Sequence, residues 1–176
     1  MVNKWSEFSL MVTIVITMSL SGCQSATMTP GPLPDPQNVT LALEDVSNNP
    51  AELKNGFFEG DHLTVQVLKS VVGDLDQDGL ADAAIIILEN TGGSGNFRDL
   101  CLLLNNGSRL EHTDSVTLGD RIEIISLTLN GEIITVRYLD RKPEEPFATK
   151  PTVPQKVRYR VHKKQLEKIT ELKLGQ

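Results

Sequence analysis

The chain has 176 residues, a formal net charge of −6 and 23% charged residues. This acidic balance excludes nucleic acid as an expected partner, because polyanions are bound by basic surfaces. There are two cysteines, one of them in the N-terminal segment, so a disulfide scaffold is excluded as well. The length fits one domain, and the abundance of branched aliphatic residues over aromatic ones favours a β-rich core.

Residues 1–22 are predicted to be an export signal rather than part of the fold. Phe8 to Leu20 is an apolar stretch of 13 residues, too short for a comfortable transmembrane helix. It ends in Leu20-Ser21-Gly22-Cys23, which resembles the lipobox of bacterial lipoproteins. The resemblance implies cleavage before Cys23, lipidation of its thiol and acylation of the new amino terminus. The membrane would then be a partner through Cys23. An ordinary export signal or an N-terminal anchor helix is the alternative.

Residues 23–38 follow as the lipidated cysteine and a proline-rich tether. Four prolines alternate with small and polar residues and show no apolar periodicity, which indicates an extended spacer. Gln24 stands where an aspartate would retain a Gram-negative lipoprotein in the inner membrane. The lipobox resemblance therefore implies a bacterial cell-envelope location, in the outer membrane facing the periplasm if the cell is Gram-negative.

The folded domain is predicted to span residues 39–176 and to consist of short strands. Alternating apolar residues predict strands at 39–43 and 63–72, and continuous apolar runs at 83–88 and 100–104 predict central strands covered on both faces. Asn55-Gly56 predicts a tight hairpin turn. Residues 109–118 read weakly as a strand, ended by Leu118-Gly119-Asp120.

The C-terminal part continues the same pattern. Asn130-Gly131 lies between two apolar runs, 122–129 and 132–139, and predicts the clearest hairpin of the chain. The alternation slips at Ile124-Ile125, which predicts a bulge. Residues 141–154 contain four prolines and are predicted to form a loop before a strand at 157–161. Leu166, Ile169 and Leu172 fit a short helix as well as a strand end.

About nine strands joined by hairpin signals, without a βαβ pattern, predict a mainly β fold. The expected architecture is a single antiparallel sandwich or a partly open barrel, with a short C-terminal helix as an open option. A propeller is not expected, because it would need several copies of the aspartate motif described below, which occurs once.

The main chemical motif is a run of four aspartates around a glycine. Asp74, Asp76, Asp78 and Asp82 hold relative positions one, three, five and nine, with Gly79 at six. Carboxylates packed this closely repel one another and favour a hard cation among them. The spacing is that of a calcium loop, in which the carbonyl of Leu80 would fill position seven. Ile85 occupies position twelve, where an EF-hand has glutamate, so modest affinity is expected.

The motif resembles the Asp-x-Asp-x-Asp-Gly-x-x-Asp loop of FG-GAP repeats in integrin α-subunit propellers and related bacterial β-domains. The resemblance implies one structural calcium ion, bound by Asp74, Asp76, Asp78 and Asp82 and by the Leu80 carbonyl. The alternative is a solvated Asp/Gly turn without a metal.

Other motifs favour structural interpretations. The loop Gly92-Gly93-Ser94-Gly95 lacks a following helix and a P-loop lysine, so a flexible turn is expected rather than an anion site. The three histidines are far apart in sequence and are predicted to be exposed, and Cys101 is predicted to be a core thiol. Asp120-Arg121 and Asp140-Arg141 at strand ends predict ion pairs or turn caps, with a recognition surface as the alternative. Ser94 and Ser115 lack a nucleophile-elbow motif. The three histidines named above are His62, His112 and His162.

Three blocks in this order, 73–97, 118–122 and 138–147, resemble a family of bacterial envelope lipoproteins without an assigned activity. Its members share a tether, a Gly-Asp-Leu-Asp-x-Asp-Gly loop and a later Asp-Arg-Lys-Pro loop. The resemblance implies a location and a fold more than an activity.

The sequence thus favours a lipid-anchored envelope β-domain with one structural calcium ion. We expect it to act without catalysis, as a binding or envelope-maintenance module with an envelope protein as a candidate partner. One alternative is a metal-assisted envelope hydrolase, which would need a deep polar pocket containing Asp120, Arg121, Asp140 or Arg141. The other is an inhibitor or accessory subunit that docks the loop at 141–154 into an envelope enzyme.

Overall fold

The computed structural model describes residues 34–43 and 50–170, and this part of the chain is built from β-strands. It contains no helix long and apolar enough to cross a membrane. The predicted signal and Cys23 lie outside the described residues. The strands are β1 (Thr40–Leu41), β2 (Ala51–Glu52), β3 (Phe57–Glu59), β4 (Thr64–Gly73), β5 (Asp82–Asn90), β6 (Phe97–Asn105), β7 (Leu110–Asp120), β8 (Glu123–Asn130), β9 (Ile133–Asp140), β10 (Val153–His162) and β11 (Gln165–Lys168).

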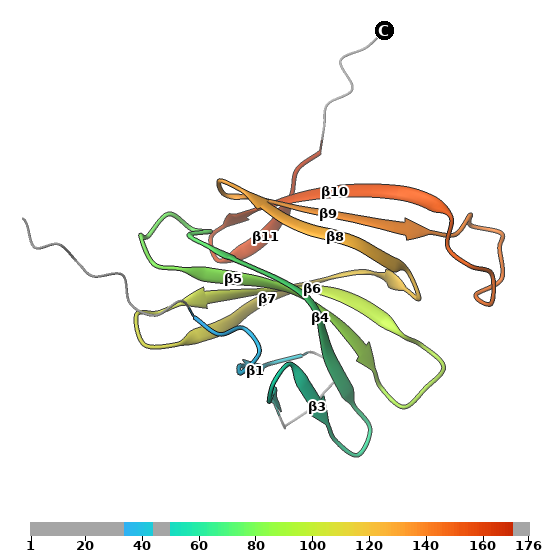
Figure 1. The fold of residues 1–176 in the computed structure, drawn as a ribbon, viewed down its shortest axis with the longest axis horizontal. Coiled ribbons are helices and arrows are strands. Elements are labelled where there is room, and N and C mark those ends of the chain that lie inside the picture. Colours follow the sequence, from blue (N-terminus) through green and yellow to red (C-terminus); the bar gives the residue numbers. More distant parts are fainter. Residues whose placement is uncertain (1–33, 44–49, 171–176) are drawn as a thin grey trace, which may run out of the picture. The chain divides into compact units, whose positions relative to one another are not determined.

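The strands form three antiparallel sheets. A five-stranded sheet has the order β3-β4-β5-β6-β7, a four-stranded sheet has the order β11-β10-β9-β8, and β1 pairs with β2. The four-stranded sheet lies over one face of the five-stranded sheet, and β1 lies on the other side (Figure 1). None of the sheets closes on itself. The predicted mainly β, antiparallel fold is confirmed, and of its two predicted forms, a sandwich or a partly open barrel, the arrangement of the sheets is that of a sandwich.

The main core lies between the two large sheets. Because side chains alternate along a strand, Ala84 and Ile86 of β5 and Leu100 and Leu102 of β6 point to the same side. They pack there with residues of the four-stranded sheet, among them Ile134. This layer provides the apolar burial that stabilises the sandwich.

A second core covers the opposite face of the same strands. Ile85 and Ile87 of β5 and Cys101 of β6 are fully buried there, against Leu41 of β1 and Ala51 of β2. The strands β5 and β6 are therefore covered on both faces, as their continuous apolar runs predict.

The predicted turns are largely confirmed. Asn55 and Gly56 have φ values of 52° and 76°, in the left-handed region that a tight hairpin turn requires. The β8–β9 hairpin is also present, but its two loop residues are Gly131 and Glu132, one position later than predicted. The pairing of β8 skips Ile125, so the bulge predicted there is confirmed.

Two predictions about element boundaries are wrong. Strand β7 continues through Gly119 to Asp120, because its pairing with β6 extends to Phe97. Strand β10 begins at Val153 and includes Pro154, which is accepted because β11 covers only the later part of β10. The alternative left open at the C-terminus is decided in favour of a strand for residues 165–168, which pair with β10 as β11, whereas Leu172 lies outside the described residues.

Candidate functional site

The aspartate motif forms the connection between β4 and β5. Gly73 and Asp82 pair with each other at its two ends. Between them, Leu75 is 1% exposed and packs in the core between the large sheets. Gln77 and Gly79 have φ values of 67° and 87°, which turn the chain back toward β5. The connection is thus a folded loop with a buried anchor.

Backbone hydrogen bonds orient the aspartate side chains of this loop. Asp74 accepts hydrogen bonds from the Gln77 N–H through Oδ1 (2.7 Å) and from the Gly79 N–H through Oδ2 (3.0 Å). Asp78 accepts one from the Leu80 N–H (2.7 Å). These side-chain-to-backbone bonds are typical of Asx turns and leave further lone pairs on each carboxylate.

Three of the predicted ligands come together. One carboxylate oxygen from each of Asp74, Asp76 and Asp78 lies within 4.8 Å of the others, so this surface group could hold a metal ion. An all-oxygen, anionic donor set fits a hard divalent cation better than a soft one. Leu80, whose carbonyl is the predicted fourth ligand, is 36% exposed beside them.

Asp82, the fifth predicted ligand, lies outside this group of three. It is fully buried, and its two carboxylate oxygens accept hydrogen bonds from the N–H groups of Leu75 and Asn105, each at 2.8 Å. Burial raises the pKa of Asp82, with smaller contributions from the charges of Asp76 and Asp78, while the two hydrogen bonds oppose the shift. Asp82 therefore joins the start of the loop to the end of β6.

The loop also contacts the opposite sheet. The Gln77 side-chain amide donates a hydrogen bond to Glu132 in the β8–β9 turn. Gly73 lies so close to Leu129 of β8 that an added Cβ would stand 2.5 Å from its Cδ2. Sequence reasoning missed these contacts, because nothing in the chain order indicates that the two turns meet.

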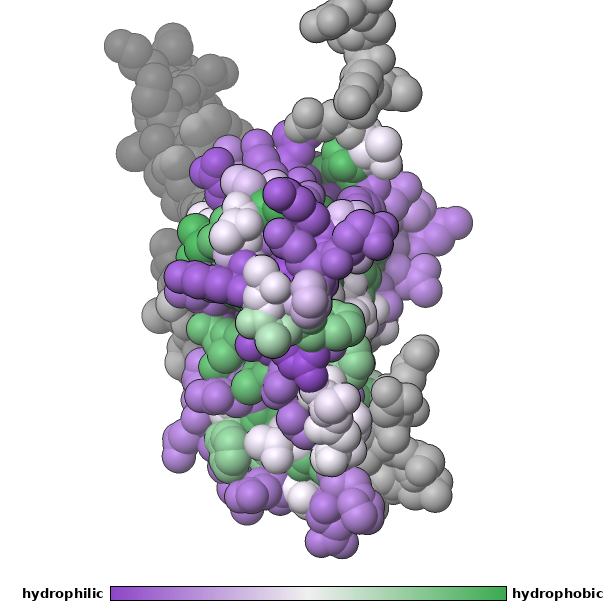
Figure 2. Space-filling view, turned by 90° about the vertical axis from the view of Figure 1, so that its right-hand side faces the viewer, coloured by the Kyte–Doolittle hydropathy of each residue, from purple (hydrophilic) through white to green (hydrophobic). Residues whose placement is uncertain are grey.

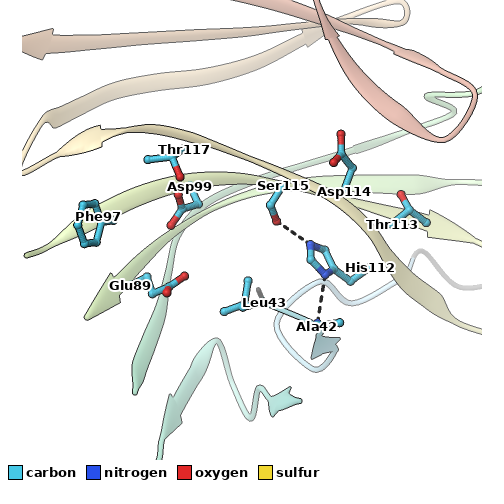
Figure 3. Close-up of a pocket in the computed structure, with 10 residues that line it drawn as sticks. All are labelled: Ala42, Leu43, Glu89, Phe97, Asp99, His112, Thr113, Asp114, Ser115 and Thr117. Carbon is cyan, nitrogen blue, oxygen red and sulfur yellow. Dashed lines mark hydrogen bonds between the residues drawn. The ribbon is translucent and has the colours of Figure 1, made fainter. Parts of the chain in front are cut away.

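A second candidate site is a cavity of about 450 Å³ on the outer face of the five-stranded sheet. Its walls come from β5, β6 and β7 and from the residues after β1 (Figure 3). His112 lies in this wall and is partly buried. The prediction that all three histidines are exposed is therefore wrong for His112, although His62 and His162 are exposed.

The hydrogen bonds of His112 determine its tautomer. The Ala42 N–H donates to Nδ1 at 3.1 Å, so Nδ1 carries a lone pair and the proton resides on Nε2. Nε2 lies 2.7 Å from the Ser115 Oγ, to which it therefore donates (Figure 3). Burial lowers the pKa of His112, which favours the neutral ring. In this state His112 cannot accept the proton of Ser115, as a serine hydrolase requires.

Two buried carboxylates line the same cavity. Glu89 is 7% exposed and Asp99 is 6% exposed. Asp99 pairs with Ile87 across β5 and β6, and Glu89 stands two residues further along β5, so both side chains lie on the cavity face. The sequence contains a signal for this pair that was missed. Glu89 directly follows the predicted central strand at 83–88, and Asp99 directly precedes the predicted central strand at 100–104.

Cys101 lies two residues from Asp99 along β6, on the same face, and is fully buried. Burial raises the pKa of the thiol to about 12, and the charges of Asp99 and Glu89 add to this effect. A thiol in this state is protonated at neutral pH and is not a nucleophile, in agreement with its predicted core role.

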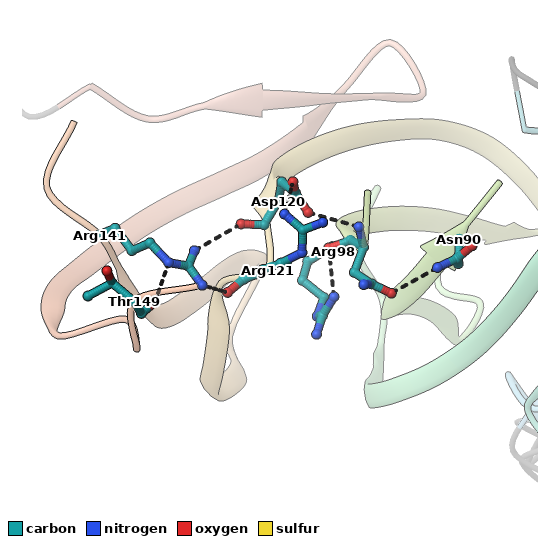
Figure 4. Close-up of polar contacts among 7 residues, drawn as sticks. Asn90, Arg98, Asp120, Arg121, Arg141 and Thr149 are labelled. Atoms are coloured by element: carbon teal, nitrogen blue, oxygen red, sulfur yellow. Dashed lines mark hydrogen bonds and ion pairs between the residues drawn. The ribbon is translucent and has the colours of Figure 1, made fainter. Parts of the chain in front are cut away.

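The two predicted Asp-Arg pairs meet in one polar network. The Arg121 guanidinium forms an ion pair with Asp120 at 3.1 Å, and Asp140 caps the Arg141 N–H at 2.7 Å. Arg141 donates to the carbonyls of Thr149, Asp120 and Arg121 (Figure 4). The side chains thus form ion pairs and caps, as predicted, and hold the β9–β10 loop against the β7–β8 turn.

The loop between β9 and β10, residues 141–152, is exposed and internally bonded. Phe147 is 62% exposed, and the Arg121 guanidinium lies 5.2 Å from its ring centroid. The Lys142 carbonyl accepts from the Glu145 N–H. Figure 2 shows the side of the molecule that carries this loop, where separate hydrophobic groups interrupt a hydrophilic surface.

Comparison of the chain with protein-family models, with curated proteins and with solved structures finds no match.

Proposed function

We propose that this protein is a lipid-anchored component of a bacterial cell envelope, whose β-sandwich binds one structural calcium ion and acts as a non-catalytic binding module. The observation that carries the proposal is the convergence of Asp74, Asp76 and Asp78 within 4.8 Å. The anchor rests on the Leu-Ser-Gly-Cys motif that ends at Cys23. The two features agree, because extracytoplasmic modules use calcium sites of modest affinity.

Calcium suits this loop better than magnesium. Calcium accepts six to eight oxygen ligands in irregular geometry, whereas magnesium requires a near-ideal octahedron. The loop offers three carboxylates and neighbouring backbone carbonyls from a short, sharply turned segment. The bound ion would neutralise the clustered charges and hold the loop in its folded form, next to the Gln77–Glu132 contact with the other sheet.

A non-catalytic role is supported by the chemistry of the polar groups. The cavity on the outer sheet face contains none of Asp120, Arg121, Asp140 and Arg141, the residues on which the hydrolase alternative depends. The hydrogen bond from Ala42 places the proton of His112 on the side of Ser115, so this pair lacks a base. The buried Cys101 thiol is protonated.

Calorimetric titration of the full chain in mild detergent tests the calcium site. We expect wild-type protein to bind one Ca²⁺ and to bind Mg²⁺ much more weakly. Asp76→Ala should abolish the heat of calcium binding, because it removes one of three charged ligands. Asp61→Ala, which removes an exposed acid outside the loop, is the matched control. A wild-type protein without heat at millimolar calcium would contradict the proposed site.

The β9–β10 loop supports a second candidate function. It is exposed, and so is its Phe147 side chain. Arg141, at the start of the loop, donates to the Thr149 carbonyl near its end and to the Arg121 carbonyl of the β7–β8 turn. An exposed aromatic residue on a held loop can enter a pocket of another protein with little loss of conformational entropy. This arrangement favours an accessory subunit or inhibitor of an envelope enzyme over the hydrolase alternative.

A further inference from the structure

The cavity on the outer face of the five-stranded sheet has a lining that is rich in acceptors. Among the described residues, its walls contain the carboxylates of Glu89 and Asp99 and the hydroxyls of Ser115 and Thr117, and no lysine or arginine. Thr113 also lines it, and its Oγ1 is buried without a hydrogen-bond partner among the described residues. Buried polar groups of this kind are normally satisfied by protein, water or a ligand.

The negative charge of this lining is concentrated by burial. Glu89 and Asp99 are each more than nine-tenths buried and lie on adjacent strands, where the low local dielectric strengthens their field. The negative charges of these two carboxylates help to raise the pKa of the nearby Cys101 thiol. His112 adds no compensating positive charge in its neutral form. The lining therefore favours a cation.

The shape of the site distinguishes an organic cation from a metal ion. In the part of the chain that the structure describes, the aspartate loop is the group whose ligand atoms lie close enough to hold a metal, and the cavity carboxylates form no such group. A volume of about 450 Å³ also exceeds that of a single ion many times over. Phe97, which is 37% exposed, lines the cavity with an aromatic ring, a group that attracts cations.

We propose that this cavity binds an organic cation, the ammonium or guanidinium group of a basic side chain or of a free amine, between Glu89, Asp99 and Phe97. Both carboxylates also interact with other groups. Because an ionised carboxylate has about four lone-pair sites, the cation would share these oxygens with those groups. The inference rests on the proposed binding role and names its ligand class, but it is independent of calcium and of the lipid anchor.

Titration followed by NMR tests the site, with the full chain in detergent and with chelator present so that the calcium loop does not contribute. The cationic probes are agmatine, a free guanidinium compound, and acetyl-Gly-Arg-Gly-amide, in which the same group belongs to a peptide. The neutral probe is the citrulline analogue of the peptide. We expect both cationic probes to shift amide signals of β5, β6 and β7, and the citrulline peptide to leave them unchanged.

The variants Glu89→Gln and Asp99→Asn should each weaken binding of the cationic probes about tenfold or more, since each removes a charge-assisted hydrogen bond. Glu123→Gln, an exposed strand glutamate in the other sheet, is the matched control and should bind like wild type. If the buried-site variants fail to fold, Phe97→Leu replaces them, with an expected weakening of about twofold to fivefold.

The relative affinities of the probes identify the source of the cation. Tighter binding of the peptide supports a basic side chain of a protein partner, and tighter binding of agmatine supports a free amine. Equal binding of the citrulline peptide, unchanged affinity in Glu89→Gln and Asp99→Asn, or no binding of either cationic probe at millimolar concentration would overturn the inference. A failed calcium titration would not affect it.

Discussion

At the scale of single residues, the four aspartates of the β4–β5 loop have two different roles. Asp74, Asp76 and Asp78 gather at the surface, where their charges remain available to an ion. Asp82 is fully buried and gives both oxygens to backbone N–H groups. A buried carboxylate bonded in this way is part of the framework of the fold, because an unpaired buried N–H group is costly.

We therefore expect Asp82→Asn to destabilise the protein even when no metal is present. Asparagine keeps one acceptor oxygen but turns an amide N–H₂ toward the second backbone N–H, so the free energy of unfolding should fall by about 1–3 kcal/mol. Urea unfolding in the presence of chelator measures this. Asp78→Asn is the control, with an expected change within about 0.5 kcal/mol. A loss of stability confined to calcium-containing buffer would instead make Asp82 a metal ligand.

The motif was readable from the sequence, but this division of roles was not. The spacing of Asp74, Asp76 and Asp78 is local, and three residues two apart in a turn can be expected to converge. One of the two partners of Asp82 is the N–H of Asn105, at the end of the next strand, and this contact depends on the register of β5 and β6. His112 was missed for the same reason, since its partner Ala42 lies 70 residues away in sequence.

At the scale of elements, the strands were predictable and their ends were less so. Continuous apolar runs identified β5 and β6, and the slip at Ile124-Ile125 identified the bulge in β8. The ends of β7 and β10 were misplaced because Gly119 and Pro154 are poor strand residues by local preference. Cross-strand pairing with Arg98 and Leu139 outweighs that preference.

The β9–β10 loop illustrates how one side chain can organise an element. Arg141→Ala would remove hydrogen bonds to the carbonyls of Thr149, Asp120 and Arg121. We expect the loop to become more mobile and chymotrypsin to cleave after the exposed Phe147 several times faster than in wild type. Mass spectrometry of the early fragments measures the rate. Arg137→Ala, at an exposed position of β9, is the control, and equal rates for the two variants would contradict this role of Arg141.

At the scale of the whole molecule, each face of the five-stranded sheet has a different cover. One face packs against the four-stranded sheet, and the other is covered by β1 and β2 over its apolar half. The remaining half carries Glu89, Asp99 and His112. One sheet thus supplies both the structural core and the proposed cation site, and the aspartate loop lies at the junction of the two large sheets.

The proposed membrane attachment is also a property of the whole chain. When the full chain is expressed in a bacterial host, we expect it to partition into the detergent phase and to carry a diacylglyceryl group on Cys23, detectable by mass spectrometry of its N-terminal peptide. Cys23→Ser should move it to the aqueous phase. Cys101→Ala is the control, because the Cys101 thiol is buried and protonated. Detergent partitioning that persists in Cys23→Ser would contradict lipidation at this residue.

The strands at the edges of the two large sheets determine how easily crowded copies of the protein could pair edge to edge. The five-stranded sheet is bordered on one side by β7, whose pairing with β6 shifts register twice. On its other side the border is the three residues of β3 and then the rest of β4, which has an irregularity between Val67 and Lys69. The four-stranded sheet is bordered by β8, with its bulge at Ile125, and on the other side by the four residues of β11 and the first part of β10, which contains Pro154. Among the described residues, borders that are short, bulged or interrupted by proline offer no long, straight row of free backbone groups to a neighbouring copy. Molecules concentrated on a lipid surface would therefore resist joining edge to edge into continuous sheets or fibres.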